Sequence, residues 1–239
     1  MNRWMTRICA AGLLGGMSMF LGSCAHNDDM LVVIGAMAAT PPDCKFSPSA
    51  SATLMMSGTV DVGFGAKYTA VLLVANQLAS RGSKARLRGE TSNVNINNAE
   101  VRLLAGGTLD IGYFSVPASG YIPVGSGEDS GYGAIAIDVL PGSVVIPDNT
   151  GYIIAEIRVQ GTTLGGTDIE SNLFRFQIFV VDSSKAGGGG LVYYPVLDST
   201  NNCVCGTSSA VVTSCFPGQD AYIACCNCSL GFCKRQPQP

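Results

Sequence analysis

Hydrophobic and polar residues alternate with a period of two along much of residues 53–181. Such alternation places every second side chain on one face of a β-strand, whereas a helix repeats its apolar face every three or four residues. Residues 68–76 are instead apolar at nearly every position, which predicts a central strand covered on both faces. The alternating segments that predict half-buried strands are 60–64, 99–103, 135–139, 153–159 and 174–180.

Gly, Pro, Asn and Asp cluster between these segments and predict turns. The run 63–67 predicts a bend between two strands rather than a phosphate-binding loop. Six to nine strands, with no amphipathic helices between them, predict an all-β fold: an antiparallel β-sandwich of the immunoglobulin-like type. The predicted turns are 106–107, 117–120, 125–133, 141–142, 148–151 and 161–167.

The amino-acid composition supports this fold class. Charged residues make up 13% of the chain, against about 25% in typical soluble domains. The chain has 30 glycines but only five lysines and five glutamates, the residues in which helical bundles and coiled coils are rich. The hydrophobic content of 47% also excludes a largely disordered chain.

The first 23 residues have the features of an export signal. Arg3 and Arg7 precede an uncharged apolar stretch, Ile8–Leu21, which is shorter than the ~20 residues of a membrane-spanning helix. The stretch ends in Leu21-Gly22-Ser23-Cys24, which resembles the lipobox of bacterial lipoproteins: an apolar residue, two small residues and a cysteine. Gly22 departs mildly from the family pattern, in which alanine is commoner at this position.

This resemblance implies that Cys24 becomes the first residue of the mature protein. Its thiol would carry a diacylglyceryl group and its amine a third acyl chain such as palmitate. Two or more acyl chains anchor a protein stably to a bilayer. In the family, an aspartate after the cysteine favours retention in the inner membrane, but here that residue is Ala25. We therefore expect a lipid anchor in the outer membrane, on its periplasmic face or at the cell surface.

The sequence divides into four segments. After the signal peptide, 1–23, residues 24–50 form a tether with a first strand near Met30–Ile34, and residues 51–186 form the predicted sandwich. The last segment, 187–239, combines a glycine hinge, a short strand at 191–197 and a cysteine-rich tail. Phrases such as SGTVDVGF, YTAVLLVANQL and CFPGQD are similar to those of uncharacterised predicted lipoproteins of Gram-negative soil bacteria, and this resemblance implies no activity.

Cysteine usage predicts a disulfide-stapled tail. Of ten cysteines, Cys9 leaves with the signal and Cys24 carries lipid, so eight remain in an oxidising compartment. Seven of these lie in the last 37 residues, and an odd number cannot pair completely among themselves. Cys44 is therefore expected to pair with a tail cysteine, whose identity the sequence leaves open. The eight candidates are Cys44, Cys203, Cys205, Cys215, Cys225, Cys226, Cys228 and Cys233.

The density of cysteines in the tail also admits a different chemistry. Cys203-x-Cys205 and Cys225-Cys226-x-Cys228 are close enough to bind a soft metal as thiolates. The paired CxxC spacing of zinc sites is missing, however, and an oxidising compartment favours disulfides. We therefore predict no metal site and no cofactor beyond the covalent lipid on Cys24.

Four cations lie within eight positions of a predicted loop, and they offer a candidate contact for an anion or a partner. The patch could bind lipid phosphates, an anionic glycan or an acidic protein, or it could be a solvated loop that keeps strand edges from pairing. Without Arg3 and Arg7 the mature chain has 12 basic and 17 acidic residues, a formal charge of −5, so we expect no nucleic-acid partner. The four cations are Arg81, Lys84, Arg86 and Arg88.

The sequence lacks the residues of common enzymes. His26 is the only histidine and lies beside the lipid cysteine, so no Ser-His-Asp or Cys-His pair can form on the domain. The loop 125–131 lacks the ligand spacing of a calcium-binding EF-hand. A pair of carboxylates could hydrolyse a glycan, but the sequence cannot place two of them across a cleft. The carboxylates available are Glu90, Glu100, Asp110, Glu128, Asp129, Asp168 and Glu170.

These observations favour a non-catalytic, membrane-anchored lipoprotein of the cell envelope with a structural, binding or adhesive role. Its partners would be the membrane, through the lipid, and an envelope protein or glycan. Loops 77–92 and 119–133 are the expected contacts, because the function of a sandwich usually lies in its end loops. A thiolate metal-binding protein is the alternative interpretation, and an envelope glycan hydrolase is the third.

Overall fold

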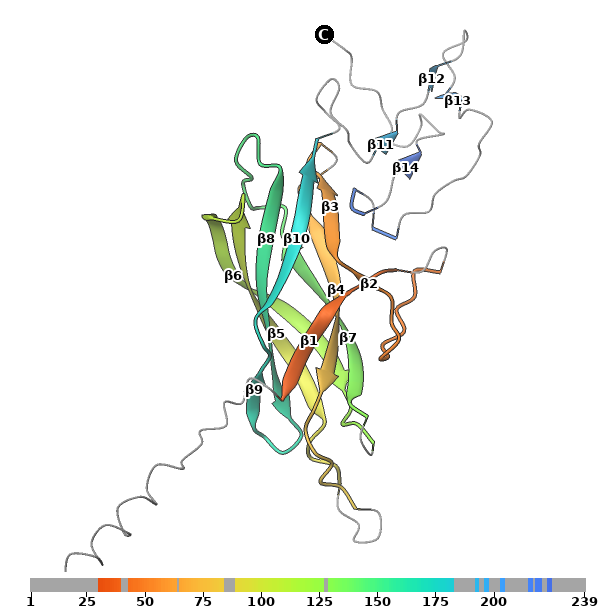
Figure 1. The fold of residues 1–239 in the computed structure, drawn as a ribbon, viewed down its shortest axis with the longest axis vertical. Coiled ribbons are helices and arrows are strands. Elements are labelled where there is room, and N and C mark those ends of the chain that lie inside the picture. The colour runs from red at the N-terminus through yellow and green to blue at the C-terminus, as the bar shows by residue number, and fades with distance from the viewer. Residues whose placement is uncertain are drawn as a thin grey trace, which may run out of the picture.

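The computed structural model is all-β, and its two packed sheets confirm the predicted sandwich (Figure 1). The structure describes residues 30–39, 43–63, 65–83, 89–126 and 129–182, together with 192–193, 196–197, 203–204, 215–216, 218–220 and 223–224. The predicted signal peptide, Cys24 and the glycine hinge lie outside these residues.

The sandwich consists of a four-stranded and a six-stranded sheet. The first has the order β2-β1-β4-β7, formed by Leu54–Met55 (β2), Leu31–Met37 (β1), Tyr68–Asn76 (β4) and Gly131–Leu140 (β7). The second has the order β3-β10-β8-β5-β6, formed by Ser57–Asp61 (β3), Phe174–Val181 (β10), Tyr152–Thr163 (β8), Val94–Ala105 (β5) and Leu109–Ile122 (β6), with Asp168–Glu170 (β9) beside β8. The sheets therefore include β1, in the segment that the sequence assigned to the tether and first strand.

The tail contributes two short strand pairs. Val192–Tyr193 (β11) pairs in parallel with Ile223–Ala224 (β14), and Val196–Leu197 (β12) pairs antiparallel with Cys203–Val204 (β13). The single strand predicted at 191–197 is thus two short strands, each paired with a different part of the tail.

One pair in the sandwich departs from the predicted antiparallel arrangement. β3 runs parallel to β10, with Val60 opposite Val180. Antiparallel neighbours are commonly joined by a tight hairpin, whereas a parallel pair needs a long connection. More than 100 residues separate these two strands in the sequence, so no hairpin sets their relative direction. The six-stranded sheet is therefore mixed.

The turn predicted at 117–120 is wrong, because these residues lie inside β6. Pro117 has no N–H to donate, but β6 is the edge strand of its sheet, and its pairing with β5 is irregular between Ile96 and Asn98, opposite this proline. Edge strands and bulges are the places where a sheet tolerates proline. The turns predicted at 125–133 and 161–167 are shorter than expected, since β7 begins at Gly131 and β8 continues to Thr163.

The prediction that residues 68–76 form a strand covered on both faces is confirmed. On the inner face of β4, Leu72 and Val74 are fully buried in the main core between the two sheets. On its outer face, Val71 and Leu73 form a second, smaller core under Phe46, Leu54 and Phe216 and their neighbours. The segment after β1 and the tail thus cover a sheet face that would otherwise meet water.

Candidate functional site

The loops of the sandwich form two groups, one at each end. Leu31, which begins β1, pairs with Asn76, which ends β4, and Asn76 pairs with Gly131, which begins β7. We call this the N-terminal end; it comprises Met30 and the connections 77–93, 123–130 and 164–167. The opposite end comprises the connections 62–67, 106–108 and 141–151.

Tail residues 215–216 and 218–220, which we call the clasp, bind to the sandwich near the end that lies opposite the N-terminal end. Cys215 forms a disulfide with Cys44, with their Cα atoms 5.4 Å apart and 171 positions between them in the sequence. This bond agrees with the prediction that Cys44 pairs with a tail cysteine, and it identifies the partner. Cys203 lies in β13, and Cys205, Cys225, Cys226, Cys228 and Cys233 lie outside the described residues.

Gln219 of the clasp joins the two sheets to each other. Its backbone forms an antiparallel bridge with Val60 of β3, in the six-stranded sheet. Its side-chain carbonyl accepts a hydrogen bond from the Thr69 N–H (2.9 Å), and its side-chain amide donates one to the Thr69 carbonyl (2.8 Å), in the four-stranded sheet. The residue is only 4% exposed. Its amide therefore satisfies backbone groups of β4 that would otherwise lack partners.

The neighbouring Asp220 is held between the same two sheets. Its carboxylate accepts hydrogen bonds from the Tyr68 hydroxyl (2.7 Å) and the Thr59 N–H (2.8 Å). Burial raises the pKa of the Asp220 carboxyl, although these hydrogen bonds act in the opposite direction. Burial and the charge of Asp220 also raise the pKa of the Tyr68 hydroxyl above its usual range. A Cβ at Gly58 would overlap the Tyr68 ring, so only glycine leaves room for this arrangement.

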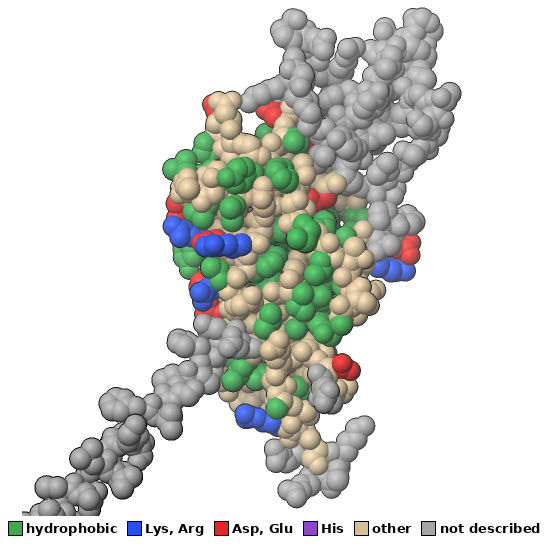
Figure 2. All heavy atoms as spheres, in the orientation of Figure 1, with side chains coloured by type: hydrophobic (Ala, Val, Ile, Leu, Met, Phe, Trp, Pro, Cys, Tyr) green, Lys and Arg blue, Asp and Glu red, His purple; other side chains and the backbone are tan. Residues whose placement is uncertain are grey.

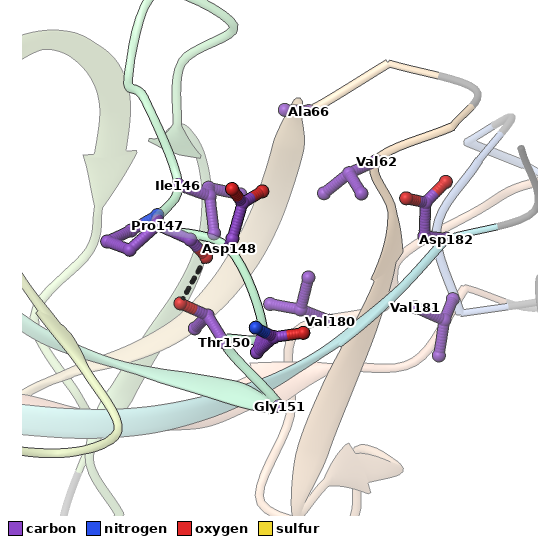
Figure 3. Close-up of a pocket in the computed structure, with 11 residues that line it drawn as sticks. Val62, Ala66, Ile146, Pro147, Asp148, Thr150, Gly151, Val180, Val181 and Asp182 are labelled. Carbon is purple, nitrogen blue, oxygen red and sulfur yellow. Dashed lines mark hydrogen bonds between the residues drawn. The ribbon is translucent and has the colours of Figure 1, made fainter. Parts of the chain in front are cut away.

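A pocket of about 490 Å³ opens at the same end of the sandwich (Figure 3). Val62, Ile146 and Val180 give it an apolar lining, and Figure 3 shows Asp148 and Asp182 on opposite sides of it. The wall between β7 and β8 is a turn in which the Thr150 hydroxyl donates to the Pro147 carbonyl (2.7 Å) and Asn149 adopts a φ of 61°. An apolar lining with carboxylates at the side suits a ligand with an apolar body and a hydrogen-bond donor or cationic group.

Sequence reasoning missed this pocket. It identified 148–151 only as a turn, and the other walls come from Val62, Ala66 and residues 180–182, far away in the chain. The one local signal was Asp148-Asn149, since asparagine tolerates the left-handed conformation that the turn requires.

The described part of the predicted cationic loop lies at the N-terminal end. Arg81 is exposed, whereas Lys84, Arg86 and Arg88 lie outside the described residues. The Glu90 carboxylate accepts hydrogen bonds from the Ser80 hydroxyl and from the N–H groups of Arg81, Gly82 and Ser92. These bonds, led by that of Ser80, lower the pKa of Glu90 to about 2. Residues 79–82 and 90–92 therefore form a fixed neck at the base of the connection between β4 and β5.

The carboxylates considered for glycan hydrolysis are mostly engaged on the outer face of the six-stranded sheet. Figure 2 shows acidic and basic side chains beside one another on this face. The partners are Arg102 for Asp110, Arg158 for Glu170, Thr162 for Asp168, and Tyr113 with Gln160 for Glu100. Residues 127–128 lie outside the described residues. Within the described ranges, no group of three or more His, Cys, Asp or Glu residues is placed to hold a metal ion.

Comparison with known proteins gives no family: no protein-family model matches the chain, and no curated protein matches it. The described residues contain no helix long and apolar enough to cross a membrane.

Proposed function

We propose that the chain is a non-catalytic lipoprotein of the cell envelope, anchored through Cys24, which presents the opposite end of its sandwich for binding. The observation that carries the proposal is the order of features along the chain. A lipobox is followed by a tether of only six residues, 25–30, and then by β1, which lies inside the sandwich. A domain that begins so soon after the cysteine would be held close to the membrane.

The disulfide between the clasp and Cys44 supports a location outside the cytoplasm. The Cys44–Cys215 disulfide closes most of the mature chain into one loop, and structural disulfides persist in oxidising compartments. Oxidising conditions also favour disulfides over thiolate metal sites, although Cys215 is not one of the cysteines considered as metal ligands. Titration of free thiols and analysis of bound metal on the extracted protein would distinguish a fully oxidised tail from a metal-loaded one.

The pocket supports a binding role better than a catalytic one. Its apolar lining would provide affinity, and the Asp148 carboxylate would orient the ligand. The hydrogen-bonded partners of most of the carboxylates considered for hydrolysis lie on the outer sheet face, away from this pocket. An envelope protein or glycan that carries an amine is the class of partner that fits the pocket.

Mass spectrometry of the protein extracted from its membrane tests the anchor. We expect a mature N-terminus at Cys24, with acyl chains on both its sulfur and its amine. Cys24→Ala should carry no acyl chain, whereas Gly22→Ala, which restores the commoner lipobox residue, should be processed normally. A mature N-terminus elsewhere, or an unmodified Cys24, would overturn the proposal.

Photo-crosslinking in cells tests the binding surface. A crosslinker at Asn149, on the rim of the pocket, should give adducts that disappear when Asp148→Ala is added. The matched position is Ser119, which is exposed on the six-stranded sheet. Adducts from Ser119 in the absence of adducts from Asn149 would contradict the proposal and indicate that the partner binds the face of the six-stranded sheet.

A further inference from the structure

The six-stranded sheet has two edge strands, β3 and β6, and the clasp covers only β3. The Asp61 N–H donates to the Gly218 carbonyl (2.8 Å), and the Asp220 N–H donates to the Thr59 carbonyl (2.9 Å). At the other edge, β6 has β5 as its neighbour in the sheet, and it lies at the left margin of the sheet in Figure 1. Within the described part of the chain, residues 109–116 make no backbone–backbone hydrogen bond outside their ladder with β5.

The register of the sheet shows which backbone groups of β6 point outward. In β8, the Val159 carbonyl accepts a hydrogen bond from the Ser171 N–H, and the Val159 N–H donates to the Ser171 hydroxyl, so the backbone of Val159 faces away from β5. Successive residues of an antiparallel ladder alternate in direction. Counting along the paired residues of β8, β5 and β6 places the N–H and C=O groups of Tyr113 and Ser115 on the open side. Pro117 falls on the same side, so its missing N–H breaks no bond to β5.

The open edge contains a short stretch without the features that protect edge strands. Charged side chains, prolines and bulges are the common protection. In β6 these features lie on either side of residues 112–116: Pro117 follows the stretch, and Ile111, the extra residue of an irregular pairing, precedes it. The one charged residue of β6, Asp110, also lies outside the stretch. Tyr113, within it, is 64% exposed. A regular, uncharged edge with an exposed aromatic side chain is a surface on which another strand can pair.

This stretch is complementary to itself when a second copy approaches in the antiparallel direction. With a twofold axis at Phe114, Tyr113 of each copy pairs with Ser115 of the other, and their outward N–H and C=O groups form four hydrogen bonds. The irregular positions also coincide, since Pro117 falls opposite Ile111 of the second copy. One neighbouring register would place Tyr113 opposite Pro117, which has no N–H, and the other would place Ser115 opposite the bulge. The twofold at Phe114 is therefore the register that keeps all four bonds.

The side chains fit the same register. Phe114, partly buried against the main core, would meet Phe114 of the second copy in a pair without hydrogen bonds, where facing side chains approach most closely. Gly112 would lie opposite Val116, so a residue without a side chain faces a branched one. On the outer face, Tyr113 would lie diagonally between Tyr113 and Pro117 of the second copy, within reach of an aromatic ring. No charged residue would face a like charge across the junction, because residues 112–116 carry none.

We infer that two copies of the chain pair through residues 112–116 of β6, antiparallel about Phe114, and so join their six-stranded sheets into one continuous sheet. The partner of this edge is a second copy because the stretch matches itself in hydrogen bonding, shape and charge. Since the stretch is only five residues long, the association is expected to be reversible and to depend on concentration. The inference does not depend on the lipid anchor or on the pocket.

Sedimentation velocity of the protein, purified from its membrane in detergent, over a series of concentrations tests the pairing. Ser115→Pro removes an outward N–H from each copy, so the dimer loses two hydrogen bonds and its dissociation constant should rise about 30-fold. Ser115→Ala is the matched control: it removes only the hydroxyl, which donates to the Asn98 side chain (2.7 Å) within the same copy, and it keeps the N–H. We expect the dissociation constant of Ser115→Ala to match that of the wild type.

A second pair of variants tests the edge without changing the backbone. Tyr113→Lys removes the exposed ring and places two like charges diagonally across the junction, so dimerisation should weaken strongly. Tyr121→Lys is its control, because Tyr121 lies on the same strand, is 52% exposed and falls outside residues 112–116. We expect Tyr121→Lys to dimerise like the wild type. Thermal unfolding of each variant confirms that it is folded, and Tyr113→Lys keeps the test decisive if Ser115→Pro does not fold.

Crosslinking identifies the register and the partner. A photo-crosslinker at Tyr113, in a mixture of unlabelled and ¹⁵N-labelled protein, should join peptides of the two kinds within residues 111–117. A protein that remains monomeric at every concentration would overturn the inference, as would a dimer that neither Ser115→Pro nor Tyr113→Lys weakens. Crosslinks from position 113 to a different protein, with none to a second copy, would show that β6 pairs with a foreign strand and would overturn the choice of partner. None of these outcomes bears on the anchor at Cys24.

Discussion

The Cys44–Cys215 disulfide is expected to contribute several kcal/mol to the stability of the fold. It closes a loop of 171 residues. In the chain-entropy model, a crosslink over about 170 residues lowers the entropy of the unfolded chain enough to stabilise the fold by about 5 kcal/mol at 25 °C, and removal of native disulfides typically costs about 2–5 kcal/mol. We therefore expect Cys44→Ser/Cys215→Ser to lower the free energy of unfolding by about 3–5 kcal/mol.

The double substitution is a cleaner perturbation than a reducing agent. It leaves six tail cysteines, an even number, whereas reduction would also break any bridges among them. Equilibrium unfolding in urea measures both the free energy and the m-value. Since the crosslink acts mainly on the unfolded state, its loss should also raise the m-value as the unfolded chain expands.

A packing control separates the crosslink from its surroundings. Phe46 and Phe216 have ring centroids 6.3 Å apart next to the disulfide, so Phe46→Leu disturbs the same contact while keeping the bond. We expect it to cost less than about 1.5 kcal/mol, with no change in the m-value. A loss below about 1 kcal/mol for the cysteine pair, with an unchanged m-value, would refute the reasoning, because it would mean that the clasp holds equally well without the covalent link.

Four further predictions concern three single residues. Gly58→Ala should destabilise the fold by about 1–3 kcal/mol by overpacking against Tyr68. Gly142→Ala, whose Cβ would meet nothing closer than the Ala66 carbonyl oxygen at 4.0 Å, should be nearly neutral in the same thermal unfolding assay. Asp220→Ala leaves the buried Tyr68 hydroxyl without its acceptor and should cost about 1–3 kcal/mol. Because the pKa of Asp220 is raised on folding, the stability of the wild type relative to Asp220→Asn should increase as the pH falls from 7 toward 4; a flat difference would contradict this assignment. Glu90 should behave in the opposite way, since its pKa falls to about 2: the advantage of the wild type over Glu90→Gln should be full above about pH 5 and disappear as the pH approaches 2.

The strands were predictable because their signal is local. Burial alternates strictly along β8, from Tyr152 to Thr163, as the apolar pattern predicts. Pro117 led to the wrong prediction of a turn at 117–120. Proline indicates a turn unless its strand lies at the edge of a sheet, and the order of strands in a sheet is not a local property of the sequence. The direction of β3 relative to β10 was unpredictable for a similar reason, since the two strands meet only after most of the domain has folded between them.

Of the candidate site, the sequence predicted only what the number of cysteines requires, and not what depends on the three-dimensional arrangement of the chain. Parity required Cys44 to pair with the tail, and it does, but the choice of Cys215 depends on which cysteine the clasp brings to within 5.4 Å. The pocket has walls from three distant segments, and none of them has a distinctive sequence. The cationic run was visible in the sequence, but the position of Gln77, the first residue of its connection, beside Met30 follows from the pairing of β1 with β4.

The clasp pairs with backbone groups of β3 and β4 that the strand order leaves without partners. β3 is only five residues long and is the edge strand of its sheet in the described strand order, and an edge strand presents unpaired N–H and C=O groups to other chains. β4 has a similar gap at Thr69, because its pairing with β1 extends only from Leu72 to Asn76. A glutamine is suited to closing both gaps: its backbone pairs with β3, while its side-chain amide offers Thr69 the same donor and acceptor as a peptide group. Glutamate would lack the donor, and asparagine would be one methylene too short. Since residues 215–220 follow every strand of the sandwich in the sequence, both gaps stay open during synthesis until the tail arrives, so the tail completes the domain.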